Sequence, residues 1–441
     1  MISRRKFVSN ATLGAAGVAI GATAKSYAQI IGANERVNFA IHGLNGRGYA
    51  HLSALKNNAK NARITHVCDV DSKILDKFMG QATKELGYSP TPETDFRHVL
   101  ASKDVDAITV ATPDHWHAPM AIRGLQAGKH VYVEKPSSHN PHEGEMLIAV
   151  RDKTKLLVQV GDQQRSAPHT IEMIEKIHSG SIIGKAYFAK AWYNNTRKSM
   201  GHGTEVPVPP NLNWDIWQGP APRRPYVSNV HPYNWHWLKI YGTGEALNNG
   251  THEVDVARWA LNVDYPNRVT ASGGRYAYKD DWQFPDTMVT SFEYDNALLS
   301  WDGMSCSGVG LYGRDRGVAI HGETGTVVID RGGYDVYDQK NKLSSSFRVK
   351  GAANDTADLL SRDSMTDVHF GNFIAGIRTG EKLHSPIEIA NVSVTILQLS
   401  NIAWSVNREL KLDPTNGKIL HDPEAMKSWS REYEKGWAPT V

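Results

Sequence analysis

Short apolar runs alternate with amphipathic segments between Val37 and Val160, and this repeat constrains the fold more than any other feature of the sequence. Repeated strand–helix units of this length are typical of a parallel, doubly wound sheet with helices on both faces. Ligands bind such sheets at the edge formed by the strand C-termini. The expected strands are 37–41, 63–68, 107–110, 130–133 and 157–160, and the expected helices are 49–56, 72–86, 119–127 and 141–153.

The pattern changes after Gly161, where strand-like runs are separated by Gly- and Asp-rich turns. This spacing predicts a large, mostly antiparallel open sheet that is half covered by helices. The expected strands are 269–278, 287–294, 298–304, 318–321 and 326–330, and the expected helices are 170–178, 366–378 and 389–407. The predicted fold class is therefore α/β, with an N-terminal doubly wound domain and a C-terminal α+β domain.

The first residues resemble an export signal rather than part of the fold. The segment Ser3–Val8 contains paired arginines, a weakly apolar run follows at 11–24, and Ser26 and Ala28 suit a signal-peptidase site. We therefore expect residues 1–28 to be a twin-arginine signal peptide and the protein to be periplasmic. The apolar run is too short to span a bilayer, and no later segment approaches the roughly 20 apolar residues of a membrane helix. A membrane anchor is not expected.

The charge balance argues against a nucleic-acid partner. Lys and Arg number 49 and Asp and Glu 46, which gives a net charge of +3, and the basic residues are dispersed along the chain. The 19 histidines show no spacing typical of a zinc or iron site, so no metal is expected.

A glycine-rich turn, Gly-Leu-Asn-Gly-Arg-Gly, follows the first expected strand and precedes a helix. In this place glycines let the backbone approach a pyrophosphate, whose charge the helix N-terminus stabilises. The second glycine of the usual pattern is Asn45, which tolerates a positive φ better than most residues. Asp69 ends the second strand, where a carboxylate accepts hydrogen bonds from ribose hydroxyls and repels a 2′-phosphate. We expect NAD rather than NADP, and the candidate ligands are Gly43, Asn45, Gly46, Arg47, Gly48 and Asp69.

Two later motifs, Ala-Thr-Pro-Asp-His-Trp-His at 111–117 and Gly-Lys-His-Val-Tyr-Val-Glu-Lys-Pro at 128–136, complete a recognisable set. With the glycine-rich turn they closely resemble the Gfo/Idh/MocA family, named for glucose–fructose oxidoreductase and inositol dehydrogenase. The resemblance extends from about Arg36 to the C-terminus. It implies an NAD(P)-binding Rossmann domain at 33–160 and a substrate-binding and oligomerisation domain at 161–441. It also implies that the nicotinamide–ribose region is lined by Thr112, Pro113 and His117, and that the ribose and the substrate hydroxyl are reached by Glu134 and Lys135.

The chemistry of Lys135 can also be argued from the residue itself. Oxidation of a secondary alcohol needs a base at the hydroxyl proton while hydride leaves for the nicotinamide. A desolvated lysine beside a cationic ring has a depressed pKa, so it can accept this proton near neutrality.

A second cluster lies at 241–255, where many dehydrogenases of the family carry Asp-x-Gly-x-His-x-x-Asp. Here Gly250, His252 and Asp255 match, but the first Asp is Asn248, whose amide does not exchange a proton at ordinary pH. Either His252 performs the acid–base chemistry with Lys135, or Glu245 replaces the missing carboxylate. We take Lys135, His252 and Asn248 as the catalytic candidates.

The substrate candidates lie at the domain junction and on a long aromatic loop. By the resemblance, Gln163 and Arg165 enter a sugar site, and an arginine with amides at a sheet edge suits a polyhydroxylated ligand. Trp235 and His236 lie on the loop, where aromatic faces stack on sugar C–H groups. His252 belongs to this set as well.

These observations predict a periplasmic NAD(P)-dependent oxidoreductase that acts on a secondary alcohol of a sugar or sugar derivative and keeps and recycles its cofactor. The alternative is a redox-neutral, NAD-dependent glycosidase or lyase that acts through a transient 3-keto sugar. Retention of Glu134-Lys135-Pro136 favours the oxidoreductase. Retention of Lys135 and His252 argues against a third possibility, a non-enzymatic sugar-binding or sensing protein. We expect a small carbohydrate substrate and a homo-oligomer formed through the C-terminal sheet.

Overall fold

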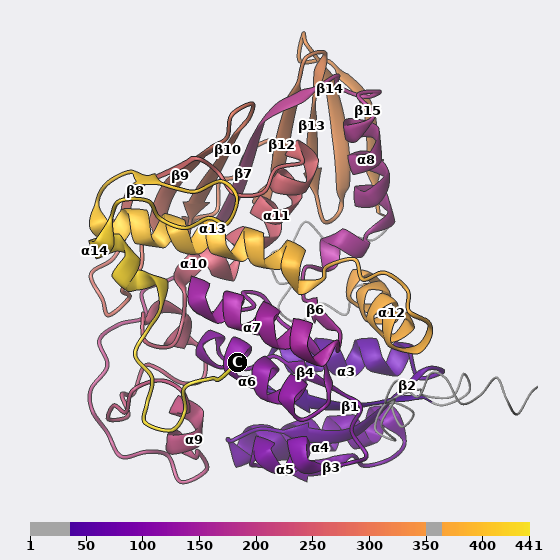
Figure 1. Ribbon diagram of the computed structural model, residues 1–441, viewed down its shortest axis with the longest axis vertical. Helices are drawn as coiled ribbons and strands as arrows, with labels where there is room; N and C mark the ends of the chain where they lie inside the picture. Colours follow the sequence, from indigo (N-terminus) through magenta and orange to yellow (C-terminus); the bar gives the residue numbers. More distant parts are fainter. Residues whose placement is uncertain (1–35, 350–363) are drawn as a thin grey trace, which may run out of the picture.

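The computed structural model describes residues 36–349 and 364–441. The expected signal peptide and the polar stretch at 351–363, for which the sequence predicts a loop, lie outside these residues. Two sheets are placed one above the other, with a long helix between them (Figure 1).

The N-terminal sheet has six parallel strands in the order β3-β2-β1-β4-β5-β6. They are β1 (Val37–His42), β2 (Ala62–Cys68), β3 (Thr91–Glu93), β4 (Ala107–Val110), β5 (His130–Val133) and β6 (Val158–Val160). The order reverses between β1 and β4, so a crevice for a dinucleotide lies at the C-terminal ends of these strands. The predicted Rossmann sheet is confirmed, with β3 added at the edge.

The helices of this domain are α3 (Arg47–Asn57), α4 (Ser72–Leu86), α5 (Phe96–Ala101), α6 (Asp114–Gln126) and α7 (Pro141–Thr154). The prediction that the third expected helix starts at Pro119 is wrong, because α6 begins at Asp114 and contains Pro119. A proline within a helix leaves the carbonyl four residues earlier without its amide donor. Here that carbonyl belongs to His115, and it accepts a hydrogen bond of 2.6 Å from Arg431 Nη2.

Helix α12 (Ser364–Thr379) returns from the C-terminal half of the chain to pack against α3 and the Rossmann sheet. Phe370 and Phe373 of α12 are fully buried in the Rossmann core. The ring of Phe370 stacks on Tyr132 of β5 with 4.1 Å between centroids. The Rossmann core is therefore completed by residues distant in the sequence.

The C-terminal sheet has ten strands and is mostly antiparallel, as predicted, with β7 and β10 running parallel. Its strand order is β15-β14-β13-β12-β7-β10-β9-β8-β16, and β11 pairs with β7. The strands are β7 (Ala186–Thr196), β8 (Arg268–Gly274), β9 (Thr287–Glu293), β10 (Leu298–Met304), β11 (Cys306–Ser307), β12 (Arg316–Gly322), β13 (Gly325–Asp330), β14 (Gly333–Asp338), β15 (Leu343–Arg348) and β16 (Leu410–Lys411).

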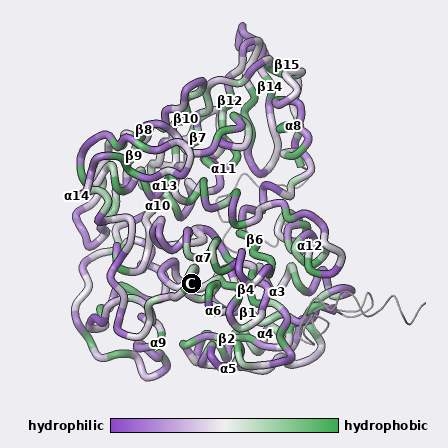
Figure 2. Tube along the Cα trace, in the orientation of Figure 1, coloured by the Kyte–Doolittle hydropathy of each residue, from purple (hydrophilic) through white to green (hydrophobic). Residues whose placement is uncertain are grey.

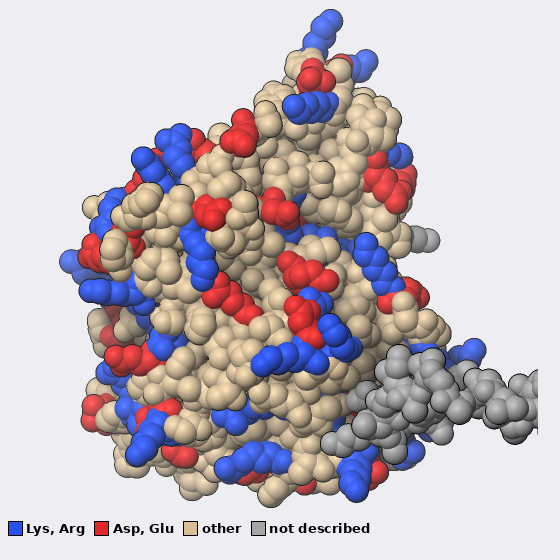
Figure 3. All heavy atoms as spheres, viewed as in Figure 1, with Lys and Arg blue, Asp and Glu red and all other residues tan. Residues whose placement is uncertain are grey.

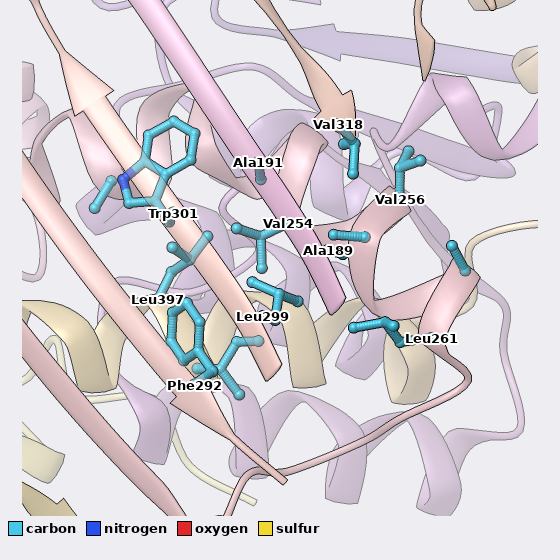
Figure 4. Close-up of a cluster of buried hydrophobic side chains, with 14 of the residues drawn as sticks. Ala189, Ala191, Val254, Val256, Leu261, Phe292, Leu299, Trp301, Val318 and Leu397 are labelled. Carbon is cyan, nitrogen blue, oxygen red and sulfur yellow. The ribbon is translucent and has the colours of Figure 1, made fainter. Parts of the chain in front are cut away.

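Helices cover one face of this sheet. They include α8 (Pro168–His178), α10 (Gly244–Asn248), α11 (Gly250–Leu261) and α13 (Ile387–Val406). Figure 4 shows the packing at its centre: Val254 of α11 and Leu397 of α13 lie against Leu299 and Trp301 of β10. Apolar residues concentrate along such buried elements, whereas the loops are hydrophilic (Figure 2). Acidic and basic side chains are interspersed on the face shown in Figure 3.

By length and composition alone, helix α13 could cross a bilayer. This differs from the expectation that no segment after the N-terminal one approaches the length of a membrane helix. However, 72% of its most apolar window is buried inside the structure. It lies between the C-terminal sheet and α7 of the Rossmann domain (Figure 1). Its apolar character is explained by contact with both domains.

The remaining chain forms a long loop and a C-terminal tail beside the Rossmann domain. Short helices mark these segments: α9 (Trp214–Gln218), α14 (Pro423–Met426) and the 3-10 turns η2 (Asn234–Trp237) and η4 (Lys427–Trp429). The tail ends beside α6, where the indole of Trp437 packs edge-on against Trp116, with 5.4 Å between centroids (Figure 1).

The two domains are joined by a buried ion pair. Arg165, in the 3-10 turn η1 (Gln163–Ser166) after β6, donates two hydrogen bonds of 2.6 and 2.9 Å to Asp255 of α11. Asp255 also accepts a hydrogen bond from Ser393 of α13. Both charged side chains are almost completely buried, so their mutual neutralisation is required.

We predict that Arg165→Met lowers the free energy of unfolding by about 3–5 kcal/mol, because it leaves the Asp255 carboxylate buried without its main partner. Urea denaturation of the NAD-free protein measures this. Arg151→Met is the matched control: Arg151 pairs with the half-exposed Glu388, and its loss costs less than about 1 kcal/mol. Equal losses in the two variants would contradict the role given to the buried pair.

Candidate cofactor and substrate site

A cavity of about 460 Å³ opens at the C-terminal ends of the Rossmann strands and extends to the C-terminal sheet. The candidates that line it are Gly43, Asn45, Gly46, Arg47, Asp69, Thr112, Pro113, His117, Glu134, Lys135, Gln163, Trp235, His236, Asn248 and His252. Two candidates do not line it. Arg165 is held in its ion pair with Asp255, and a side chain on Gly48 would lie 2.5 Å from the carbonyl oxygen of Gly43. Gly48 thus allows close packing within the turn, and the structure gives Arg165 a joining role.

The glycine-rich turn brings the backbone close to β4. Gly43 has φ +82°, and a Cβ there would lie 2.4 Å from the carbonyl oxygen of Ala111. The second positive φ falls on Gly46, at +47°, and not on Asn45 as expected. Gly46 is also the N-cap of α3 and has no side-chain cap, so the positive end of this helix faces the cavity.

Asp69 fastens this turn from the end of β2. Its Oδ2 accepts a hydrogen bond of 2.8 Å from the amide of Leu44, and its Oδ1 accepts one of 2.9 Å from Asp71. Burial raises the pKa of the Asp69 carboxyl to about 6. The side chain is therefore an anion at neutral pH, at the place where a Rossmann domain meets the adenosine ribose.

Buried polar atoms at the cavity wall fit a polar ligand. Thr112 Oγ1 and both ring nitrogens of His42 have no hydrogen-bond partner among the described residues. Both residues line the cavity. Buried groups of this kind are normally hydrogen-bonded, so their orientation is consistent with a bound dinucleotide as their partner.

His117 links two loops of the site. Its Nδ1 lies 2.6 Å from the carbonyl oxygen of Pro136, and its Nε2 lies 2.7 Å from that of Thr112. The ring thereby fixes the segment after β4 relative to the segment after β5. Because Pro136 follows Lys135 directly in the chain, His117 helps to position Lys135.

Glu134 lies at the centre of a buried hydrogen-bond network. Its Oε1 accepts from Arg47 Nε at 2.8 Å, lies 2.9 Å from His51 Nε2, and accepts from Gln163 Nε2 at 3.3 Å. Burial alone would raise the pKa of this carboxyl, but the charge of Arg47 and the contact with His51 hold it well below its usual range. Glu134, which directly follows β5, is a permanent anion whose partners come from α3 and η1.

Lys135 extends from this anchor into the cavity. Its Nζ donates a hydrogen bond to the backbone carbonyl oxygen of Asn248 at the end of α10. Burial lowers the pKa of Lys135 to about 8. His252 of α11 lines the same wall, and burial together with the charges of Arg331 and Lys135 lowers its pKa well below the ordinary value.

Glu245 does not replace the missing carboxylate at the cavity wall. It is not among the lining residues, and its Oε1 accepts a hydrogen bond of 3.3 Å from Asn248 Nδ2. Its other oxygen is ion-paired with Arg197. Glu245 therefore orients the amide of Asn248, and Lys135 and His252 remain the acid–base candidates.

The aromatic loop, residues 206–237, contributes side chains to the cavity wall. His236 stacks on Trp235 with 3.6 Å between ring centroids, and both line the cavity. Elsewhere in the loop, Asn211 donates a hydrogen bond of 2.8 Å to Asp71, and His231 Nε2 lies 3.1 Å from the same carboxylate. Asp71 caps α4, so the loop is fastened to the Rossmann domain next to Asp69.

Several lining residues have no local sequence signal. They are His42, Tyr193, Asn195, Arg197, Trp217, His231, Arg316 and Arg331. Most come from the C-terminal sheet or the aromatic loop, which the fold alone brings to the cavity. Among the described residues, no group of three or more His, Cys, Asp or Glu side chains is arranged to hold a metal ion.

Comparison with known families agrees with this geometry. Residues 37–162 match the family described as "Oxidoreductase family, NAD-binding Rossmann fold". Residues 216–328 match the one described as "GFO/IDH/MocA C-terminal domain". The two matches cover the Rossmann domain and the central part of the C-terminal sheet, and they establish NAD as the cofactor class.

Individual relatives are distant. An inositol 2-dehydrogenase of Rubrobacter xylanophilus is 24% identical over 299 residues, which cover 68% of this chain and 72% of the relative. A glycosyl hydrolase family 109 protein of Shewanella sp. (strain W3-18-1) is 24% identical over 162 residues, and the match spans 36% of this chain and only 34% of that protein. The WlbA dehydrogenase of Bordetella pertussis, solved with NADH and UDP-GlcNAcA, has a TM-score of 0.63 and 19% identity, covering 86% of this chain and 99% of its own.

We predict that Asp69→Asn relaxes discrimination against NADP by about tenfold or more, because it removes the charge that repels a 2′-phosphate. Titration of NADH and NADPH into NAD-free protein, followed by fluorescence, measures this. Because the carboxylate is charged above its pKa of about 6, the wild-type preference for NAD weakens as the pH falls below 6. A wild type that binds NADPH more tightly would show that Asp69 does not select the cofactor.

We predict that alcohol oxidation depends on the neutral amine of Lys135. The rate of reduction of bound NAD then rises with pH and levels off above the Lys135 pKa of about 8. Single-turnover measurement of NADH formation across this range tests the profile. The inflection persists in His252→Gln and disappears in Lys135→Arg; persistence in Lys135→Arg would assign the titration to another group.

Proposed function

Because the chain belongs to the Gfo/Idh/MocA family of NAD-binding oxidoreductases, we propose that it oxidises a secondary alcohol of a sugar or sugar derivative. The observation that carries this proposal is Lys135. Its amine is buried at the cavity wall, has a pKa of about 8 and points toward the wall that also contains His252. The inositol 2-dehydrogenase relative supports a polyol or sugar substrate.

The residues divide the chemistry among them. The bound dinucleotide supplies the hydride acceptor. Lys135 Nζ takes the hydroxyl proton in its neutral form, while the carbonyl oxygen of Asn248 fixes the direction of the amine. His252 contacts the substrate oxygen from α11, and Trp235 and His236 present an apolar ring surface that excludes water.

We further propose that the protein works in the periplasm with a retained cofactor. The twin-arginine pattern at 3–8 supports export in a folded state. The aromatic loop is held to Asp71 by Asn211 and His231 and contributes Trp235 and His236 to the cavity wall, which favours retention of the dinucleotide. A compartment without a free NAD pool requires that the cofactor be reoxidised in place, by a second substrate or within one catalytic cycle.

A redox-neutral glycosidase or lyase is the second candidate function. It rests on the similarity to the glycosyl hydrolase family 109 protein and on Asn248, which stands where dehydrogenases of the family carry a carboxylate. In such a cycle hydride passes to NAD and a 3-keto sugar forms, the acidified C2 proton is removed and the substituent on C1 leaves. Water then adds in a glycosidase but not in a lyase, and the hydride returns to C3. The same Lys135 would move the proton in both directions.

We also propose a homo-oligomer formed through the open face of the C-terminal sheet. Val289, Leu298 and Met304 are exposed on this face, on the side opposite the buried Phe292 and Leu299. Exposed apolar side chains on one face are typical of an interface. A monomer in light-scattering measurements would contradict this assignment.

The central experiment incubates purified, NAD-containing protein with a panel of sugars and glycosides and identifies the products by NMR. We expect a ketosugar and about one equivalent of NADH that stays bound to the protein through gel filtration. When free NAD is added, we expect that the bound NADH is not released in exchange. A free aglycone with no net redox change would establish the second candidate instead. Lys135→Ala is expected to lower the rate by about 10²–10⁴-fold with NAD still bound, and retention of more than half the rate would contradict its role.

A further inference from the structure

Arg316 of β12 forms part of the cavity wall and is not explained by alcohol oxidation alone. The residue is 7% exposed. Its Nε donates a hydrogen bond of 2.7 Å to Glu253 of α11, and its guanidinium lies over the ring of Tyr193, 5.1 Å from the centroid. Within the described residues, this is the only hydrogen bond that the Arg316 side chain makes, and its Nη2 is buried without a partner.

A buried guanidinium is costly unless its donors are satisfied. The neighbouring Arg197 shows the satisfied arrangement, because its Nε and Nη2 donate to Glu245 and its Nη1 donates to the Tyr233 hydroxyl. Arg316 uses one of its three nitrogens in this way. Arg316 therefore has hydrogen-bond donors beside the cavity that no described residue uses.

The surroundings of Arg316 favour an anion. His252 experiences the positive charges of Arg331, Lys135, Arg316 and Arg47, which all lower its pKa. Arg331 lies in the turn between β13 and β14 and lines the same cavity. A cavity wall with several cations in a low-dielectric environment attracts negatively charged ligands.

The cofactor pyrophosphate is not the partner that this wall suits. The glycine-rich turn and the N-terminus of α3 provide for the pyrophosphate in the Rossmann domain. Arg316, by contrast, comes from the C-terminal sheet, next to Tyr193 of β7 and Glu253 of α11. Its position is therefore on the substrate side of the cavity.

We propose that the substrate is an acidic sugar whose carboxylate is bound by Arg316. The planar guanidinium matches a carboxylate by parallel hydrogen bonds, which a neutral hydroxymethyl group does not provide. This inference rests on the proposed oxidation of a sugar alcohol and specifies its substrate class. Arg316 is thus a specificity-determining residue, and Lys135 and His252 act on the carbinol of the same molecule.

The test uses NAD-containing protein and matched methyl glycosides: hexuronic acids, the corresponding uronamides, neutral hexosides and hexoside 6-phosphates. The uronamide is the decisive comparison, because it has nearly the same shape as the acid without its charge. We expect the second-order rate constant for single-turnover reduction of bound NAD to be about tenfold to a hundredfold higher for the acid than for the amide. Equal values for the acid and the amide, or a preference for the phosphate, would overturn the proposal.

Two variants separate specificity from folding. Arg316→Lys keeps a cation beside Glu253 but removes the planar fork, so we expect the acid-to-amide ratio to fall by about tenfold. Arg314→Lys is the control: Arg314 is also buried and paired with a carboxylate, Asp335, but does not line the cavity, and the ratio is expected to stay at the wild-type value. A ratio that falls equally in both variants would contradict a role specific to Arg316.

Binding distinguishes this proposal from the proposed reaction. Calorimetric titration of the uronic glycoside into the NAD-containing protein is carried out for the wild type and Arg316→Lys. Binding that depends on Arg316 without any NAD reduction would leave the acid site in place and reject the oxidation. Oxidation of neutral and acidic glycosides at equal rates would reject the acid site and leave the proposed oxidation in place. Absence of both binding and turnover of the acid would overturn the acid site.

Discussion

The buried carboxylate of Glu134 is the interaction on which the site depends. It joins Arg47 at the start of α3, His51 one turn later, and Gln163 at the domain junction. The glycine-rich turn, the end of β5 and the entry to the C-terminal domain are therefore held in one arrangement. Lys135 is the next residue in the chain, so its direction is fixed by the same contacts. Removing the charge of Glu134 would take away the carboxylate that Arg47 and His51 share and would weaken the contacts that hold the lysine in position.

The sequence is informative where local pattern and physical environment coincide. The apolar runs of β1, β4 and β5 are buried on both faces, so their positions and the Rossmann fold could be predicted. The edge strand β3 and the exposed β15 have no apolar pattern and were not found. The start of α6 was misplaced because the compensation for Pro119 comes from Arg431, far along the chain.

The same distinction applies to the cavity. Glu134 and Lys135 belong to a contiguous motif and were identified, whereas Arg316 reaches the site only because β12 pairs with β7. Arg165 has the side chain of a ligand, but its partner Asp255 was read only as part of a motif. Long-range pairing of charges decides whether an arginine binds substrate or joins domains, and spacing along the chain does not contain this information. The Rossmann half of the site was therefore predictable and the substrate half largely was not.

The cavity wall contains Trp116, Trp217 and Trp235, and Trp437 packs on the first of them. Indole emission overlaps the absorption band of reduced nicotinamide but not that of the oxidised form, so excitation energy passes from these rings to the cofactor only after hydride has arrived. The enzyme thus contains its own optical probe. Quenching of its native ultraviolet emission follows the redox state of the bound dinucleotide in real time, without dyes, labels or a coupled assay.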